Sequence, residues 1–242
     1  MNSRPKIDRR KFLTLSAAMA SASLVSACSS TSRQSSQGLS GLGSINDPNA
    51  RQDFNYSQAY AAVVDTEVSL PAFDYQKMDE KYLRQWVNFR SRNKPGTVIV
   101  DTSGPHLFLV QPGGKAIRYG IAVGREGFAW HGDAIMKWKQ KWPTWTPPPE
   151  MIARTPELRE FADGMPAGVN NPLGARALYL FKDGRDTLFR IHGTNRPFSI
   201  GKAASSGCFR MINQDVIHLY ERVPPGSAVY VKPNLNNVES GV

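Results

Sequence analysis

Short β-rich segments separated by glycine and proline constrain the fold of this chain more than any other feature of its sequence. They begin near Thr97, and turns such as Ser103-Gly104-Pro105 divide them. The predicted strands cover Thr97–Asp101, His106–Val110, Ala116–Val123, Ala177–Phe181, Leu188–Ile191 and Ala228–Lys232. Short strands at close spacing, joined by such turns, are typical of a β-sandwich or a small barrel.

Two segments have helical rather than strand-like spacing. Asp79–Arg90 places most of its apolar side chains on one side of a helix. With Asp65–Tyr75 it is expected to form an N-terminal extension, residues 56–95, packed on the core. Asn213–Arg222 is the second helix, with Asn213 as its N-cap and Asp215 in its first turn.

Between these regions, Gly124–Gly174 is expected to be a loop-rich insertion with a short helix at Glu157–Phe161. It holds Trp138, Trp142 and Trp145 among several prolines. The tryptophans could form a satellite core under a long loop, or they could line a ligand groove. The sequence leaves both interpretations open.

The first 28 residues are typical of an export signal. Arg9-Arg10 resembles a twin-arginine signal, and an apolar stretch up to Ala27 follows it. Val25-Ser26-Ala27-Cys28 resembles a lipobox, in which Cys28 is lipidated; the alternative is an ordinary signal peptide cut after Ala27. Residues 29–55 are rich in serine and glycine and indicate a flexible tether. We therefore expect a periplasmic protein held by a lipid anchor, with Ser29 favouring the outer membrane.

The formal net charge is +10, and about +6 remains once the basic leader is set aside. A mildly basic protein suits an acidic partner such as anionic lipid, nucleic acid or carboxylate-rich wall peptides. The sequence contains no nucleic-acid motif, and its lysines and arginines are scattered, so nucleic acid is not expected.

Cys208 is the one thiol left in the mature domain if Cys28 is processed. His192 and Gly193 end a strand-like run sixteen residues earlier, and a neighbouring histidine can activate a thiol by taking its proton. Arg210 adds positive potential, and Gly207 allows a close backbone approach that could hold an oxyanion. Spacing alone is equally compatible with His192 and Cys208 lying apart in the core.

These motifs, read together, resemble the L,D-transpeptidase catalytic domain, the YkuD family. The resemblance rests on Ile191-His192-Gly193-Thr194 and on Ser205-Ser206-Gly207-Cys208-Phe209-Arg210-Met211, and it extends over residues 96–232. One departure is Ser206, where many members carry histidine. Residues 233–242 form a C-terminal tail.

The resemblance implies a mainly β fold, a sandwich of two mixed sheets with a few short helices. It implies that Cys208 is the nucleophile and His192 the base, steered by a backbone carbonyl near Gly193. Arg210 would organise the site, and the further residues implied to shape or support it are Ser205, Ser206, Gly207 and Asn213.

The expected reaction releases D-alanine from a donor stem peptide and passes the acyl group to an acceptor stem, forming a 3→3 cross-link. An outer-membrane protein or water could also be the acceptor. Carbapenems are expected to be covalent inhibitors. A hydrolase on the same fold and a non-catalytic tethering lipoprotein are the alternatives. No cofactor is predicted, because His106, His131 and His218 lack zinc-site spacing.

Overall fold

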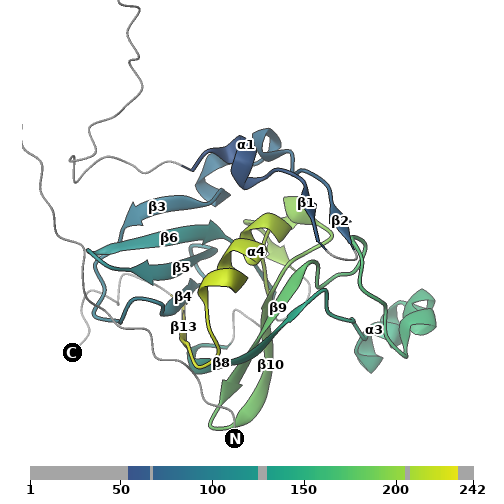
Figure 1. Ribbon diagram of the computed structural model, residues 1–242. Coiled ribbons are helices and arrows are strands. Elements are labelled where there is room, and N and C mark those ends of the chain that lie inside the picture. Colours follow the sequence, from purple (N-terminus) through teal and green to yellow (C-terminus); the bar gives the residue numbers. More distant parts are fainter. Residues whose placement is uncertain (1–53, 66–67, 125–129, 205–207, 234–242) are drawn as a thin grey trace, which may run out of the picture. The chain divides into compact units, whose positions relative to one another are not determined.

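The computed structural model describes residues 54–65, 68–124, 130–204 and 208–233 (Figure 1). Several expectations fall outside these residues: the export signal with Cys28, nearly all of the tether, the residues Ser205, Ser206 and Gly207, and the tail beyond residue 233.

Eleven strands of the described residues form one mixed sheet in the order β11-β7-β12-β10-β9-β8-β13-β4-β5-β6-β3. Their bounds are β3 Gln85–Asn88, β4 Val98–Asp101, β5 His106–Gln111, β6 Lys115–Gly120, β7 Ala122–Gly124, β8 Gly132–Lys141, β9 Arg176–Lys182, β10 Arg185–His192, β11 Ala203–Ala204, β12 Phe209–Arg210 and β13 Ala228–Lys232. The predicted strands are present, although Ala116–Val123 is divided between β6 and β7, and the expectation of a mainly β protein is confirmed.

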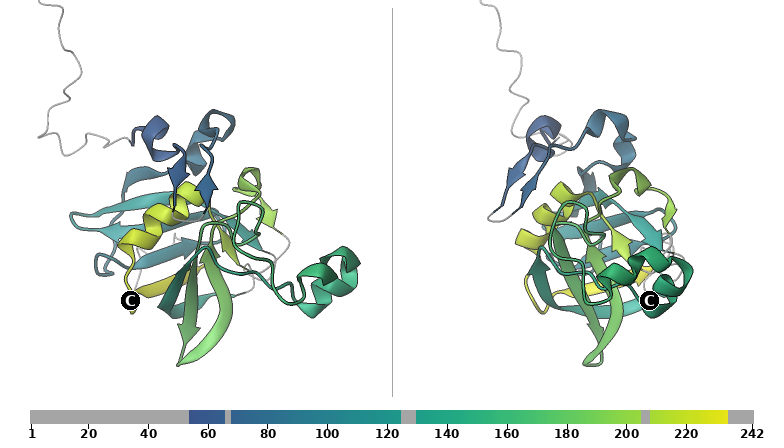
Figure 2. Two further views of the ribbon diagram at one scale, coloured as in Figure 1. Left: turned by 45° about the vertical axis from the view of Figure 1, so that its right-hand side comes forward. Right: turned by 90° about the vertical axis from the view of Figure 1, so that its right-hand side faces the viewer.

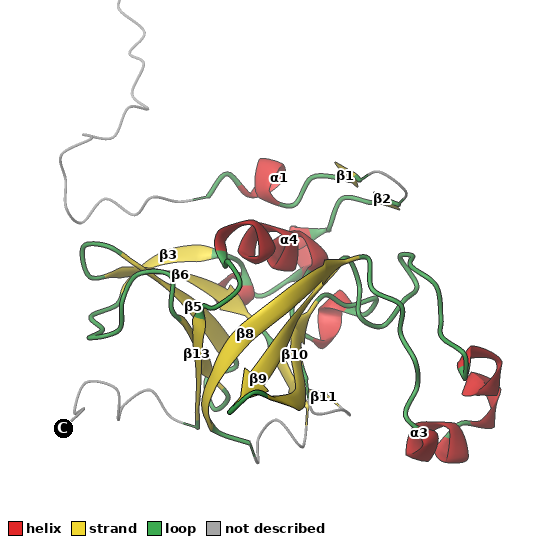
Figure 3. Cartoon of the chain, turned by 60° about the horizontal axis from the view of Figure 1, so that its bottom comes forward, coloured by secondary structure: helices red, strands yellow, loops and turns green. Residues whose placement is uncertain are grey.

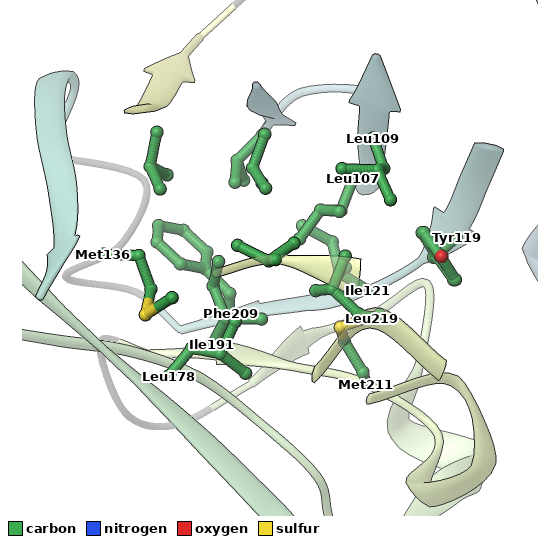
Figure 4. Packing of buried hydrophobic residues seen from close by; sticks show 14 of the residues in the cluster. Leu107, Leu109, Tyr119, Ile121, Met136, Leu178, Ile191, Phe209, Met211 and Leu219 are labelled. Atoms are coloured by element: carbon green, nitrogen blue, oxygen red, sulfur yellow. The ribbon is translucent and has the colours of Figure 1, made fainter. Parts of the chain in front are cut away.

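The sheet curls around one apolar core. Leu107 and Leu109 from β5 share a buried cluster with Leu178, Ile191 and Phe209 from β9, β10 and β12. Figure 4 shows the two groups facing each other across the core. Strands so far apart in the sheet order can meet only if the sheet bends back on itself. Burying each of these large side chains stabilises the fold by about 1.5–3 kcal/mol.

The expected sandwich of two separate sheets is wrong, because the strands form one continuous sheet. The cause is β8, a ten-residue strand within the segment expected to be loop-rich. It pairs with β9 on one side and β13 on the other, and so joins the two halves. A second, two-stranded sheet consists of β1, Val63–Val64, and β2, Ser69–Leu70.

The helix expected at Asp79–Arg90 is also wrong. The chain forms a 3-10 turn, η2, at Glu80–Tyr82 and then strand β3, which pairs antiparallel with β6. Trp86 packs toward the main core, whereas Val87 and Phe89 pack on the opposite side of the sheet. Pairing with β6 therefore overrides the helical spacing.

Helix α4 has the predicted bounds, Asn213–Arg222, and buries Val216 and Leu219 in the core. Its N-cap is Ile212 rather than the predicted Asn213. The remaining helical elements are α1 Tyr56–Ala59, η1 Tyr75–Lys77, α3 Pro149–Arg154, η3 Pro156–Phe161 and η4 Pro197–Ser199. The predicted short helix is thus the 3-10 helix η3, and together with α3 it projects away from the sheet (Figure 2). None of the helices among the described residues has the length and apolarity needed to cross a membrane.

The N-terminal segment, residues 54–65 and 68–88, runs over α4 (Figure 3). Arg84 and Asp215 form a buried ion pair there, with Nε and Oδ1 3.6 Å apart. The Tyr60 hydroxyl donates to Asp215 Oδ2 at 3.2 Å, and Gln214 Nε2 donates to the Pro71 carbonyl at 3.0 Å. The segment therefore holds the first turn of α4.

The three tryptophans of the insertion have different surroundings. Trp142 is buried in a cluster that includes Leu70, and its indole N–H donates to Asp65 Oδ2 at 2.9 Å. Trp145 is half-buried, and its backbone forms a β-bridge. Trp138 remains 42% exposed on β8. The satellite-core interpretation therefore holds for Trp142.

Candidate active site

Strands β10 and β12 bring His192 and Cys208 to the same face of the sheet. The two strands are parallel, with Ile191 opposite Phe209 and His192 opposite Arg210. Ile191 and Phe209 point into the core, so the alternating residues His192, Arg210 and Cys208 point to the other face. Extending this register places Cys208 diagonal to His192, a separation of roughly 7–8 Å that side chains can close.

His192 is held in one tautomer by its own strand end. Its ring Nδ1 lies 2.6 Å from the Gly193 carbonyl. A carbonyl oxygen only accepts, so Nδ1 carries the proton and Nε2 is left as the acceptor. The expected carbonyl partner near Gly193 is therefore present. Burial lowers the pKa of His192 to about 4, and the charge of Arg210 acts in the same direction. The imidazole is thus neutral at pH 7 and able to take a proton.

The Cys208 thiol is half-buried and faces a distorted stretch of β10. Sγ lies 3.8 Å from the Leu188 carbonyl, which accepts a weak hydrogen bond from the thiol. The pairing of β10 with β9 shifts register between Asp186 and Arg190, and Leu188 has a positive φ of 64°. Asp186 supports this conformation by accepting from the Leu188 N–H at 2.8 Å. The bulge turns the Leu188 carbonyl toward the thiol.

Arg210 lies next to His192 in the ladder, on the face that carries the thiol. Burial lowers the pKa of its guanidinium, and the negative charge of the Cys208 thiolate opposes that shift. The guanidinium remains charged at any relevant pH and so favours the thiolate form of Cys208.

Asn213, the first residue of α4, connects two backbone segments of the site through hydrogen bonds of its side chain. Its Oδ1 accepts from the backbone N–H groups of Ala175, at 2.9 Å, and Thr194, at 3.2 Å. Its Nδ2 donates to the Thr194 carbonyl at 2.9 Å. Gly193 passes so close to Asn213 Oδ1 that a Cβ atom would collide with it. Asn213 therefore fixes the turn whose carbonyl orients His192, a role the sequence reasoning assigned only as general support.

The remaining predicted site residues are Ser205, Ser206 and Gly207, and they lie outside the described residues. Their expected part in an oxyanion region stays a prediction. Of the other histidines, His106 Nε2 contacts the Lys81 carbonyl at 3.0 Å and His218 Nδ1 contacts the Tyr119 hydroxyl at 2.7 Å.

The sequence did not predict the ion pair at the bulge of β10. Arg190 and Asp186 form two hydrogen bonds, each 2.7 Å long. A hollow of about 480 Å³ lies beside the same stretch, lined by Trp130, Thr187, Phe189 and residues of the β9–β10 turn. The spacing of Asp186 and Arg190 was the available signal, but the bulge that joins them leaves no pattern in the sequence.

The arrangement is suited to nucleophilic catalysis by a thiol. A neutral, oriented imidazole and a thiol lie on one face, and an adjacent guanidinium favours the thiolate. Among the residues that the structure describes, no group of three or more His, Cys, Asp or Glu side chains is placed to hold a metal ion.

Comparisons with known proteins agree with this chemistry. Over 143 residues the chain is 45% identical to the "probable L,D-transpeptidase YbiS" of Escherichia coli K12, an alignment that covers 54% of this chain and 43% of that protein. It is 34% identical over 141 residues to "probable L,D-transpeptidase ErfK/SrfK" of the same organism, covering 55% and 43%. The alignments thus span less than half of these relatives.

A crystal structure from Brucella melitensis, named "probable carnitine operon oxidoreductase caia", is 47% identical and covers 62% of this chain and 94% of that one. The TM-score of this comparison is 0.45. The family model described as the L,D-transpeptidase catalytic domain, YkuD, matches residues 95–231, which is more than half of the chain. With the His192–Cys208 face inside that match, the chain belongs to the YkuD family of L,D-transpeptidase catalytic domains.

Proposed function

We propose that this chain is a cysteine-dependent L,D-transpeptidase that acts on peptidoglycan stem peptides. The register of β10 and β12 carries the proposal, because it puts the Cys208 thiol and the oriented His192 imidazole on one face of the sheet. The names of the curated relatives support the same activity.

In the first half-reaction, His192 Nε2 takes the thiol proton, and the Cys208 sulfur attacks the carbonyl carbon that precedes the terminal D-alanine. The backbone N–H groups of Gly207 and Cys208 stabilise the oxyanion. The C–N bond then breaks, and the departing D-alanine amine receives the proton from His192. A thioester between Cys208 and the third stem residue remains.

In the second half-reaction, an amine attacks the thioester carbonyl. His192 takes a proton from that amine, the C–S bond breaks, and the Cys208 thiolate is regenerated and reprotonated. When the amine belongs to the third residue of another stem, the product is a 3→3 cross-link. A protein amine or water completes the same step with a different product.

The test is incubation of the purified protein with disaccharide–tetrapeptides from a diaminopimelate-containing wall, followed by mass spectrometry. We expect one D-alanine to be released per dimer formed, with the new bond joining third residues. A folded Cys208→Ala protein should form neither product, and its turnover at the wild-type rate would refute the mechanism. Tripeptide without dimer would indicate a hydrolase. Wall binding without any product would indicate a tether.

We further propose that the protein is exported, with Cys28 lipidated and residues 29–55 linking the lipid to the catalytic domain. The twin-arginine pair and the lipobox-like Val25-Ser26-Ala27-Cys28 support this. Such a location would bring the thiol to the periplasmic wall.

A further inference from the structure

Three side chains form a stacked row on the face of the sheet that carries Cys208. Trp138 of β8 is the cross-strand partner of Tyr179 of β9, and their rings stack with centroids 3.6 Å apart and planes within 10°. Tyr179 is in turn the partner of Arg190 of β10, whose guanidinium lies 4.5 Å from the centre of the tyrosine ring. Strand β12 is the next strand after β10. Extending their register by one residue places Cys208 opposite Arg190, so the row continues to Cys208.

The row is held in place at several points. Asp186 fixes the Arg190 guanidinium through two hydrogen bonds, and the Tyr179 hydroxyl donates to Gln140 Oε1 at 3.4 Å. Trp138, at the far end, is 42% exposed although its ring is stacked against Tyr179. It therefore presents a flat, oriented apolar surface to solvent in line with the thiol.

We propose that Trp138 binds a sugar ring of the wall glycan, namely the N-acetylated sugar to which the donor stem peptide is attached. This inference rests on the proposed transpeptidase function. The apolar C–H face of a pyranose ring packs well on a flat indole, which offers a large apolar contact area.

The length of the stem peptide matches the distance from Cys208 to Trp138. Cys208 and Trp138 are separated by three strand spacings, which is about 14 Å. The scissile carbonyl belongs to the third stem residue, and three extended residues span about 10–11 Å. The lactoyl group that joins the stem to the sugar adds roughly the length of one more residue. A stem acylating Cys208 along this row thus ends with its sugar at Trp138.

The charges along the row suit the same occupant. The guanidinium of Arg210 lies on this face beside the thiol, whereas the charge of Arg190 is compensated by its ion pair with Asp186. A wall stem peptide is rich in carboxylates, whereas its N-acetylated sugar is neutral. The cationic end of the row thus lies where the peptide would run, and its aromatic end lies where the sugar would sit.

The experiment compares two donors, a disaccharide–tetrapeptide and the same tetrapeptide without sugar. Their dissociation constants are measured by calorimetry on Cys208→Ala protein, so that no turnover intervenes. We expect the sugar-bearing donor to bind about three- to tenfold more tightly, and we expect Trp138→Ala to remove this difference. Trp138→Phe should retain part of it.

Ile135→Ala is the matched control, because Ile135 is 44% exposed on the same strand outside the row, and it should preserve the preference for the sugar. In protein that retains Cys208, Trp138→Ala should raise KM for the sugar-bearing donor while leaving kcat and the alkylation of Cys208 by iodoacetamide unchanged. Equal binding of both donors by the otherwise wild-type protein, or a preference that survives Trp138→Ala, would overturn the sugar site and leave the transpeptidase intact. Failure of folded protein to bind either donor would overturn both.

Discussion

Removing Arg84 should destabilise the protein in a way that depends on pH. Arg84 and Asp215 are only 3% and 0% exposed, and their closest atoms, at 3.6 Å, are too far apart for a hydrogen bond. Breaking a buried pair by removing one partner costs about 3–5 kcal/mol where the remaining group stays charged. Asp215, whose pKa is about 7, can instead take up a proton, which limits the charge-related loss at pH 8 to about 1–2 kcal/mol. For a chain of this size, that loss lowers Tm by roughly 2–8 °C. Arg84→Met tests this with little change in side-chain volume.

The pH dependence identifies the cause. Burial raises the pKa of Asp215 to about 7, while the charge of Arg84 and the Tyr60 hydroxyl lower it. Without Arg84 the pKa rises further. A carboxyl whose pKa is higher in the folded than in the unfolded state loses its contribution to stability as pH rises through the folded value. The deficit of Arg84→Met should therefore be larger at pH 8 than at pH 5.

The assay is urea unfolding of wild type and variant at both pH values, followed by circular dichroism. The double variant Arg84→Met, Asp215→Asn should recover much of the loss at pH 8, because the amide can still interact with Tyr60 without carrying a charge. A loss below about 1 kcal/mol, or an equal loss at the two pH values, would contradict the view that Arg84 compensates a buried carboxylate.

The remaining predictions concern the site and the leader. His192→Ala should slow acylation by roughly two to four orders of magnitude, and the acid limb of wild-type kcat/KM should lie near the His192 pKa of about 4 rather than near 6.5; stopped-flow kinetics across pH would detect a contrary result. A carbapenem should add one drug mass to the peptide holding Cys208 and none to Cys208→Ala, and intact-mass spectra showing labelling elsewhere would refute the nucleophile. Asn213→Leu should lower unfolding free energy by about 1–3 kcal/mol for each backbone group left unpaired, and should also lower kcat; unchanged denaturation midpoints would remove its anchoring role. Metabolic labelling with a fatty acid should tag the wild type but not Cys28→Ala, and an untagged wild type would indicate an ordinary signal peptide.

Local patterns predicted the elements that depend mainly on local interactions. His106–Val110 and Asn213–Arg222 were placed within a residue of β5 and α4, because their apolar periodicity matches the face each one buries. The pairing of His192 with Cys208 came from the resemblance, since spacing alone left it undecided. The structure places His192 at the end of β10 and Cys208 directly before the neighbouring strand β12.

The wrong secondary-structure predictions lie where pairing with a distant strand outweighs the preference of the local sequence. The spacing in Asp79–Arg90 fits a helix, yet β6 offers an unpaired edge that makes Gln85–Asn88 a strand. Strand β8 lies within the segment expected to be loop-rich, and its register against β9 shifts between Met136 and Trp138, which interrupts the alternation of buried and exposed side chains that marks a strand. The positive φ of Leu188 is enforced by Asp186 and has no signature in residue type.

The position of β13 in the sheet has a consequence for how the chain acquires its fold. This strand lies between β8 and β4, and pairs with Ala134 on one side and Val98 on the other through Val229. It is also the last strand of the described residues to be synthesised. Until it emerges from the ribosome, both neighbours expose unpaired edges, and the two halves of the sheet cannot be joined. Long-range pairing of this kind slows folding and favours aggregation of incomplete chains. Translation that stops shortly before residue 228 should therefore yield an insoluble product rather than a partly active one.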